Sequence, residues 1–437
     1  MHRSIFTRAT GLLAAVLFAS LAGCQTLQAD EATRGGDDFW VNNGQLFKGD
    51  ESYDITAIAV PDLAARGAEL QVMVPALAKI ASHGGNAVAF DLPGFSGDGG
   101  SLSPHALKMV QAYADRAKDQ RMRVIVDVLG DSEDPDFRAR AVRTAARLMK
   151  REPRVIYLID GPDAGELAAK FKSAAPKLCV AAPANGDLLL VDAAPETPQP
   201  GVAYLVRSLH VPVNASMNIL LAGNEDDYTA LDQALMTEVE KQAYTPDQSM
   251  LSEAERAEGF VSLFNGKDFN NWWVFGDNPK GFHVNDCGAI EWVESGAAAL
   301  MSQKRYSDFI LRVEYKIMTE GNSGIFVRAP RAARQSKIGM EFQIHGDFGV
   351  KPSDDGTGAV YTVVAPTSNA AKPNGKWNSL EIRFEGPHLK ATLNGVVVQD
   401  ISFDDNEELK YRLRDGFIGL QDHDNYVAFR NIRIKEL

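Results

Sequence analysis

The stretch Met340-Glu341-Phe342-Gln343-Ile344-His345 alternates apolar and polar residues without a break. Successive side chains of a β-strand point to opposite faces, so the three apolar residues share one face and the three polar residues share the other. The apolar face suits a buried core, whereas the other face gathers a carboxylate, an amide and an imidazole. Arg328 and Asp347 lie close to this stretch along the chain. The pattern therefore predicts an antiparallel strand whose polar face is either a binding site or simply solvated.

The region around this stretch, from Gly259 to the C-terminus, has an all-β pattern. Alternating runs recur at 310–317, 380–384, 389–393 and 417–423, separated by turn-forming residues such as Asn394-Gly395. Many short alternating strands of this kind predict a sandwich or jelly roll over residues 251–437. The outer face of a curved sandwich can be concave, and the polar faces of neighbouring strands then converge on it.

The first half of the chain has a different pattern, in which short apolar runs alternate with helical periodicity. The clearest runs are Ile55–Val60, Ala87–Phe90, Val124–Val128 and Val155–Ile159, and four more follow. Strands that alternate with helices predict an α/β domain with a parallel sheet, which we place at residues 38–225. The last runs leave no room for full helices, so a diverged (β/α)₈ barrel and an open doubly wound sheet both remain possible. Residues 226–250 are interpreted as a helical linker.

Acidic residues follow the predicted strands of this α/β domain, at Asp91, Asp127, Asp160 and Asp192. Active sites of barrels lie at the carboxyl ends of the strands. The series resembles glycoside hydrolases of the cellulase type, but the chain has Ile159-Asp160-Gly161 where those enzymes carry an Asn-Glu step. Because aspartates in such places also cap helices and form turns, we interpret the domain as a non-catalytic or diverged partner. A glycosidase site built from the first three aspartates is the alternative.

Composition limits the class of partner. The chain has 437 residues and a formal net charge of -13, with no long basic run, which argues against nucleic acid. Beyond Cys24, the remaining cysteines, Cys179 and Cys287, lie in different predicted domains and have no spacing typical of a zinc site.

The N-terminus has the features of an export signal. Residues 1–29 contain no acidic residue, Arg3 and Arg8 precede a short apolar run, and Leu21-Ala22-Gly23-Cys24 follows it. This last segment resembles a bacterial lipobox. The resemblance implies a signal peptide over 1–24, lipidation of Cys24, a tether over 25–37 and a lipid-anchored protein of the cell envelope, on the outer membrane or facing the periplasm in a Gram-negative host. Ordinary secretory cleavage is the alternative.

Several motifs of the C-terminal region, taken in order, resemble the 3-keto-disaccharide hydrolase domain family. The motifs are Phe260–Lys267 with Trp272-Trp273, Gly321–Arg328, Glu341–Ile344, Thr357–Tyr361, Trp377-Asn378, Gly419–His423 and Phe429–Ile432. The resemblance covers about residues 255–437. It implies a concanavalin-like jelly roll that acts on glycosides oxidised at C3.

A ketone at C3 makes the hydrogen on C2 acidic. A base can remove that hydrogen, the enolate can expel the group on C1, and water can then add to the enone; without the water step the enzyme is a lyase. This chemistry needs a base, a stabiliser of the enolate and an acid. Glu341 or His423 is the expected base and Arg328 the expected stabiliser.

Other residues are expected to bind the sugar or a metal. The candidates for substrate binding are Gln343, Gln421, His345, Asp347 and Trp273. No cofactor is certain, but Glu341, His345 and Asp347 are of the types that hold a divalent metal, which could polarise the ketone. A non-catalytic carbohydrate-binding jelly roll with a diverged barrel is the alternative function.

Overall fold

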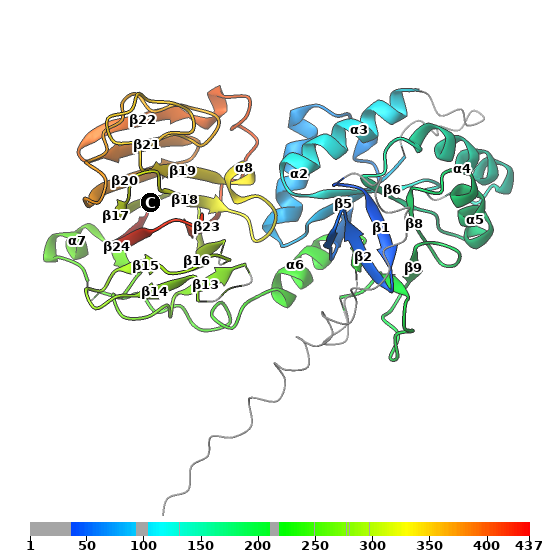
Figure 1. The fold of residues 1–437 in the computed structure, drawn as a ribbon, viewed down its shortest axis with the longest axis horizontal. Helices are drawn as coiled ribbons and strands as arrows, with labels where there is room; N and C mark the ends of the chain where they lie inside the picture. Colours follow the sequence, from blue (N-terminus) through cyan, green and yellow to red (C-terminus); the bar gives the residue numbers. More distant parts are fainter. Residues whose placement is uncertain are drawn as a thin grey trace, which may run out of the picture.

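The computed structural model shows two bodies side by side, joined by a short connection (Figure 1). It describes residues 36–92, 104–130, 132–209, 218–248, 250–276, 278, 280–296 and 298–437. The predicted signal peptide, Cys24 and most of the predicted tether lie outside these residues. Within them, no helix is long and apolar enough to span a membrane.

The first body is a closed barrel of eight parallel strands. The strands are β4 (Thr56–Ala59), β5 (Ala87–Asp91), β6 (Arg123–Asp127), β7 (Val155–Leu158), β8 (Cys179–Ala182), β9 (Leu188–Val191), β10 (Ala203–Val206) and β11 (Asn218–Leu221). Each pairs with the next, and β11 pairs with β4 to close the ring. The barrel prediction is therefore confirmed, and the open doubly wound sheet is wrong.

Helices cover one part of the barrel more fully than the rest. They are η2 (Ala64–Arg66), α2 (Leu70–Ser82), α3 (Pro104–Asp119), α4 (Pro135–Met149), α5 (Ala164–Ala174) and α6 (Glu225–Ala234). α4 begins as predicted, since the Asp134 carboxylate accepts from the N–H groups of Asp136 and Phe137. β8, β9 and β10 follow one another without helices between them.

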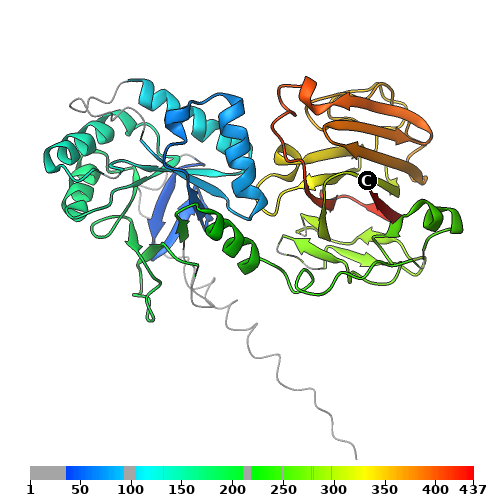
Figure 2. The ribbon, with the colours of Figure 1, turned by 180° about the vertical axis from the view of Figure 1, so that it is seen from behind.

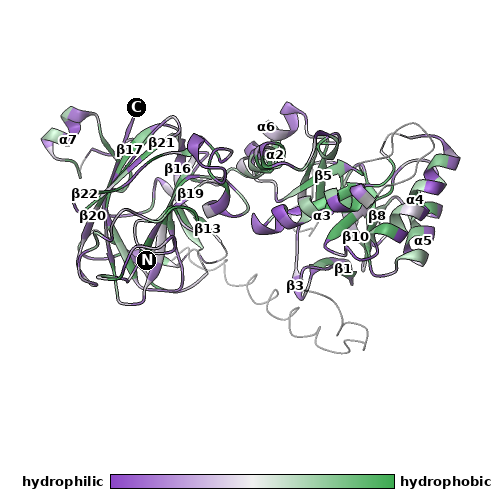
Figure 3. Ribbon diagram, turned by 90° about the horizontal axis from the view of Figure 1, so that it is seen from above, coloured by the Kyte–Doolittle hydropathy of each residue, from purple (hydrophilic) through white to green (hydrophobic). Residues whose placement is uncertain are grey.

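The helix predicted as part of a linker packs on the barrel instead. Tyr228 and Leu231 of α6 are buried in the cluster formed by the barrel's outer helices. α6 lies on the side of the barrel that faces the second body, in both views (Figures 1 and 2). Seen from above, the barrel strands are hydrophobic and the helices around them are mixed (Figure 3).

A small hairpin sheet closes the amino end of the barrel. It consists of β1 (Phe39–Asn42), β2 (Gln45–Lys48) and β3 (Glu51–Ser52). The turn at Asn43-Gly44 has positive φ at both residues, 49° and 80°, as an Asn-Gly hairpin turn requires. Phe39 and Leu46 are buried among the residues that fill the barrel. The hairpin therefore plugs the barrel interior.

The second body is formed by two antiparallel sheets around one core, as predicted. One sheet has the order β14-β15-β24-β17-β20-β21-β22, with β12 also on β24, and the other has the order β13-β16-β23-β18-β19. The strands of the first are β12 (Val261–Ser262), β14 (Phe282–Val284), β15 (Ile290–Trp292), β17 (Phe309–Ile317), β20 (Asn378–Glu385), β21 (His388–Leu393), β22 (Val396–Ser402) and β24 (Val427–Glu436). Those of the second are β13 (Trp272–Phe275), β16 (Ala299–Tyr306), β18 (Asn322–Ala329), β19 (Met340–His345) and β23 (Gly416–Gln421). The arrangement fits the predicted jelly-roll sandwich. The short elements α7 (Glu253–Glu258), α8 (Gln335–Ile338) and η3 (Phe403–Asp405) lie outside the two sheets.

The two bodies share a packed interface built around α8 and the loop before it. Ile338 is fully buried in the cluster of the barrel's outer helices, and Leu413 packs against the same cluster. Main-chain N–H groups of Ala332 and Arg334 donate to Ala81 and Gln120 of the barrel domain, at 3.1 and 3.0 Å. The loop 330–334 and α8 are therefore held by contacts with both bodies.

Candidate active site

The polar face of β19 lies on the outer side of the five-stranded sheet. Met340, Phe342 and Ile344 are buried in the core between the sheets, as the alternation predicted. Glu341 and Gln343 therefore face away from that core, toward a pocket.

This pocket, called the Glu341 pocket below, has a volume of ≈ 110 Å³. It is lined by residues of β18, β19, β23 and α8, by three loop residues and by one residue of the barrel domain. The lining residues are Arg121, Asn322, Phe326, Arg334, Gln335, Ser336, Glu341, Gln343, Tyr361, Gln421 and His423.

Glu341 is the most perturbed titratable group of the pocket. Its side chain is only 2% exposed. Burial raises the pKa of this carboxyl to about 8, although the Arg334 guanidinium and a hydrogen bond from Gln421 act in the opposite direction. A Cβ atom on Gly324, on the neighbouring strand β18, would collide with the Glu341 carboxylate. The glycine therefore makes the room that the acid occupies.

The two side-chain amides beside Glu341 differ in how many of their hydrogen-bonding groups have a partner. Gln343 donates to the Asp355 carbonyl at 3.2 Å and accepts from the Ile344 N–H at 3.1 Å, so its amide is held by the protein. By contrast, Gln421 Oε1 is buried and has no hydrogen-bond partner within the described residues. An unpaired buried acceptor costs free energy, and a sugar hydroxyl would satisfy it.

His423 and Asn322 complete the same side of the pocket. His423 Nε2 lies 3.4 Å from Asn322 Nδ2, and both side chains line the pocket together with Glu341. The structure therefore brings together four of the residues selected from the sequence: Glu341, Gln343, Gln421 and His423.

Arg328 is not among them, and its expected place beside Glu341 is wrong. The pairing of β18 with β23 shifts between Phe326 and Ala329, and Arg328 has a φ of 50°. This bulge breaks the alternation. The buried guanidinium donates instead to the carbonyls of Ser307 and Gly386 and to the Asp308 carboxylate, at 2.9 to 3.0 Å. Arg328 is thus tied to the loops at the end of the sandwich.

The structure does not bring together Glu341, His345 and Asp347, the three candidate ligands for a metal. Asp347 is buried, and its carboxylate accepts from Thr357 N–H at 2.8 Å and from Asn369 Nδ2 at 3.2 Å. His345 lies at the end of β19 and does not line the Glu341 pocket. Among the described residues, no three His, Cys, Asp or Glu side chains are grouped closely enough to hold a metal. Asp347 organises the loop after β19, because its oxygens are already engaged.

Trp273 was a candidate for substrate binding, but it does not line the Glu341 pocket. Its ring packs edge-on against Phe417 at 5.4 Å, and its Nε1–H donates to Ser302 O at 3.0 Å. Val239, in the connection between the two bodies, packs on the same apolar cluster. Trp273 is only 8% exposed, so its ring supports the sheet and is not accessible to a substrate.

The aspartates at the mouth of the barrel are engaged in turns and ion pairs. Asp127 Oδ1 accepts from the N–H groups of Leu129 and Gly130, at 2.9 and 3.0 Å. Arg207 forms ion pairs with both Asp160 and Asp192. These roles agree with the interpretation of the domain as a non-catalytic partner.

No sequence pattern indicated two arginines of the pocket. Arg334 lies in the loop before α8, and Arg121 follows α3 in the barrel domain. Neither belongs to an alternating strand, and Arg121 is more than two hundred positions away from Glu341 along the chain. Only the packing of the two bodies brings them to the pocket.

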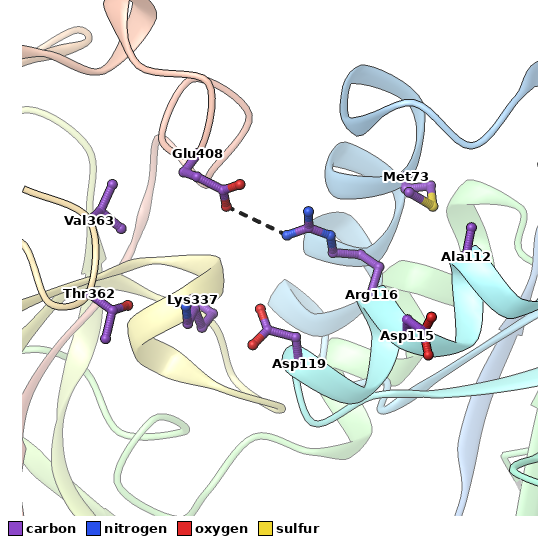
Figure 4. Close-up of a pocket in the computed structure, with 9 residues that line it drawn as sticks. All are labelled: Met73, Ala112, Asp115, Arg116, Asp119, Lys337, Thr362, Val363 and Glu408. Atoms are coloured by element: carbon purple, nitrogen blue, oxygen red, sulfur yellow. Dashed lines mark ion pairs between the residues drawn. The ribbon is translucent and has the colours of Figure 1, made fainter.

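A larger cleft opens on the other side of α8, between the two bodies (Figure 4). Its volume is ≈ 480 Å³. Arg116 on α3 reaches across it to Glu408, with 3.6 Å between Nη1 and Oε2. Lys337 lines this cleft, whereas its neighbours Gln335 and Ser336 line the Glu341 pocket. α8 thus separates the two spaces.

The C-terminal body resembles known carbohydrate-active proteins. Residues 259–435 match the profile of a family described as a 3-keto-alpha-glucoside-1,2-lyase-like domain, which confirms the resemblance predicted for this region. A 3-keto-disaccharide hydrolase of Bacteroides thetaiotaomicron is 28% identical over 231 residues, covering 41% of this chain and 79% of that protein.

Two solved structures are also similar to this chain. A candidate glycosyl hydrolase from Parabacteroides distasonis is 28% identical with a TM-score of 0.39, covering 43% of this chain and 99% of the other. A carbohydrate-binding module from Bacillus subtilis is 16% identical with a TM-score of 0.29, covering 38% and 96%.

Proposed function

We propose that the C-terminal domain cleaves glycosides that carry a ketone at C3, with Glu341 moving the C2 proton. The observation that carries this proposal is the single buried carboxyl group of the pocket, whose pKa lies at about 8. A general base works best when its pKa lies near the working pH. The similarity to a 3-keto-disaccharide hydrolase supports the substrate class.

The pocket does not suit an ordinary glycosidase. Such enzymes use two carboxyl groups that flank the glycosidic bond, about 5 to 9.5 Å apart. Among the residues that line the Glu341 pocket, Glu341 is the only carboxylic acid. One acid can serve an elimination, because the ketone rather than a second carboxylate makes the bond labile.

The proposed reaction begins when the Glu341 carboxylate takes the proton from C2. The electron pair of that C–H bond forms an enolate with the C3 ketone, and the enolate then expels the oxygen on C1, which takes up a proton. Water adds to C1 of the resulting enone, and a proton returns to C2. The net result is hydrolysis, and omission of the water step gives a lyase.

Other groups of the pocket stabilise the enolate, bind the sugar and supply the proton for the leaving oxygen. The Arg334 guanidinium, which acts electrostatically on Glu341, replaces Arg328 as the stabiliser of the enolate. Gln421 Oε1, the unpaired acceptor, receives a hydrogen bond from a sugar hydroxyl. His423 is positioned to supply the proton that the leaving oxygen needs.

The test is direct. Purified full-length protein is incubated with a 3-keto-disaccharide, a 3-keto-glucoside and the corresponding unoxidised sugars. Turnover of the oxidised sugars alone is expected, and absence of turnover with and without added divalent metals would refute the proposal. Saturable binding without turnover would instead favour the carbohydrate-binding alternative.

We also propose that the protein is a lipoprotein of the cell envelope, anchored through Cys24. The support is the lipobox-like segment in the sequence. Expression with a radiolabelled fatty acid should label the parent chain and not Cys24→Ser. An unlabelled parent chain would contradict the anchor.

A further inference from the structure

We propose that Arg121, a residue of the barrel domain, contacts the substrate in the Glu341 pocket and selects glycosides that bear a carboxylate. This inference rests on the proposed function, since it concerns the substrate of the same site. It assigns to the barrel domain a part in recognition.

The position of Arg121 is fixed by the interface between the two bodies. Arg121 lines the pocket, whose other lining residues belong to the C-terminal body. Its neighbour Gln120 accepts the Arg334 N–H at 3.0 Å. A main-chain bond thus connects the residue before Arg121 to the loop that forms one wall of the pocket.

The backbone conformation at Arg121 is one that favours glycine. The Arg121 N–H donates to Lys118 O and the Met122 N–H donates to Ala117 O, at 2.9 and 2.7 Å. These two bonds define the helix ending in which the residue at this position adopts a left-handed conformation and is usually glycine. Arg121 has a φ of 55°, which is strained for a residue with a side chain. The local fold therefore does not explain the arginine.

The charge of the pocket indicates what the arginine binds. The lining residues include two guanidinium groups and one carboxyl group, and burial keeps that carboxyl largely protonated at neutral pH. Arg334 is partly balanced by Asp119, at 3.8 Å. Arg121 forms no ion pair within the described part of the chain. The pocket is thus locally cationic in a chain with a net charge of -13.

A single carboxylate on the sugar fits this arrangement. Guanidinium groups bind carboxylates through paired, charge-assisted hydrogen bonds. A neutral sugar would bring no counter-charge to Arg121, whereas a uronic acid would. The overall negative charge of the chain still disfavours polyanions, so one carboxylate is the expected number.

The test compares matched charged and neutral substrates on the full-length chain. A 3-keto glucuronide is expected to have a kcat/KM at least about tenfold higher than the 3-keto glucoside with the same leaving group. Arg121→Gly should abolish this preference, and its Tm should equal or exceed that of the parent because glycine suits the backbone. Arg151→Gly, at an exposed arginine after α4, is the matched control and should keep the preference.

Binding gives a readout that does not need turnover. Titration calorimetry with methyl glucuronide and methyl glucoside should show tighter binding of the glucuronide by the parent, weakened by salt and lost in Arg121→Gly. Equal binding of the two sugars by the parent, or an unchanged preference in Arg121→Gly, would overturn the inference. A charge preference in binding without turnover would refute the proposed function while leaving the role of Arg121 standing.

Discussion

The mouth of the barrel and the face of the five-stranded sheet both present acidic residues, but these residues differ in how firmly protein groups hold them. At the barrel mouth, Asp160 is paired with Arg207. Burial raises the pKa of Asp127 too, but its carboxylate accepts two main-chain hydrogen bonds, which act in the opposite direction and fix it in a turn. On the sheet face, Glu341 is buried and has no ion pair within the described residues, so its pKa is raised to about 8.

The difference separates structural acids from an acid poised to move a proton. An ion pair or main-chain donors stabilise the charged form of a carboxylate and fix it in place. Burial without a close counter-charge brings the two protonation states of Glu341 close in free energy near neutral pH. We therefore assign the proposed proton transfer to Glu341 of the C-terminal domain and not to the four aspartates of the barrel.

The largest expected effect comes from removing the proton-transfer group. Glu341→Gln keeps the size of the side chain but cannot take the C2 proton. We expect kcat/KM for a 3-keto glycoside to fall by about 10³-fold, within the range typical of general acid–base catalysis. Steady-state kinetics measure this loss, and circular dichroism checks the fold. A variant with more than a tenth of the parent's activity would remove Glu341 from the mechanism.

The second effect is the pH dependence of the activity, and it is accompanied by a pH dependence of the stability. Because Glu341 acts in its ionised form, kcat/KM should rise about tenfold from pH 6 to pH 7 and level off above a pKa of about 8. A rate that falls over this range would make Glu341 the acid instead of the base.

Stability should change with pH in the opposite sense. The folded chain holds the Glu341 proton more tightly than the unfolded chain does, so stability is lost as pH rises from about 4.5 through about 8. Relative to the parent, Glu341→Gln should therefore gain on the order of 5 kcal/mol in unfolding free energy between pH 4 and pH 9. Urea unfolding of both proteins at the two pH values measures the gain, and a constant difference would contradict the raised pKa.

A third, smaller effect distinguishes Arg328 from the pocket residues. Arg328→Gln removes the guanidinium that donates to Asp308 and to two carbonyls. Its free energy of unfolding should fall by about 3 kcal/mol, because three hydrogen bonds from a buried charged group are lost, while the folded fraction keeps its turnover. Chemical denaturation and kinetics at low temperature report the two quantities. Loss of turnover at full stability would return Arg328 to the active site.

The smallest effect is expected at the barrel mouth. The double variant Asp127→Asn and Asp160→Asn should change kcat/KM for a 3-keto glycoside less than about twofold, since these side chains serve turns and an ion pair. The parent assayed in parallel is the reference. A tenfold loss in a folded variant would move the chemistry to the barrel.

Local patterns were sufficient to predict the strand that carries Glu341. The alternation from Met340 to His345 placed each side chain on the correct face, because a strand paired along its length keeps its period. Closure of the barrel could not be predicted in the same way, since it depends on the pairing of β11 with β4, which are far apart in sequence.

The errors at the site have physical causes that no local pattern reveals. A bulge turned Arg328 away from the pocket, and Val239 from another part of the chain packs on the cluster around Trp273. Arg334 and Arg121 reach the pocket only because the two bodies pack together. Residues on one strand were thus predictable, whereas residues supplied by loops and by the other domain were not.

The burial of Ile338 has a consequence for how the chain melts. Along the chain, Ile338 is part of the C-terminal body, but its side chain packs in the hydrophobic cluster of the barrel's outer helices. Separation of the two bodies would expose it to water together with Leu413, and would release the loop that carries Arg334. We therefore expect one cooperative unfolding transition for the whole chain instead of two independent ones. A fragment cut at the domain boundary would keep Glu341 but lose the order of the wall that faces it.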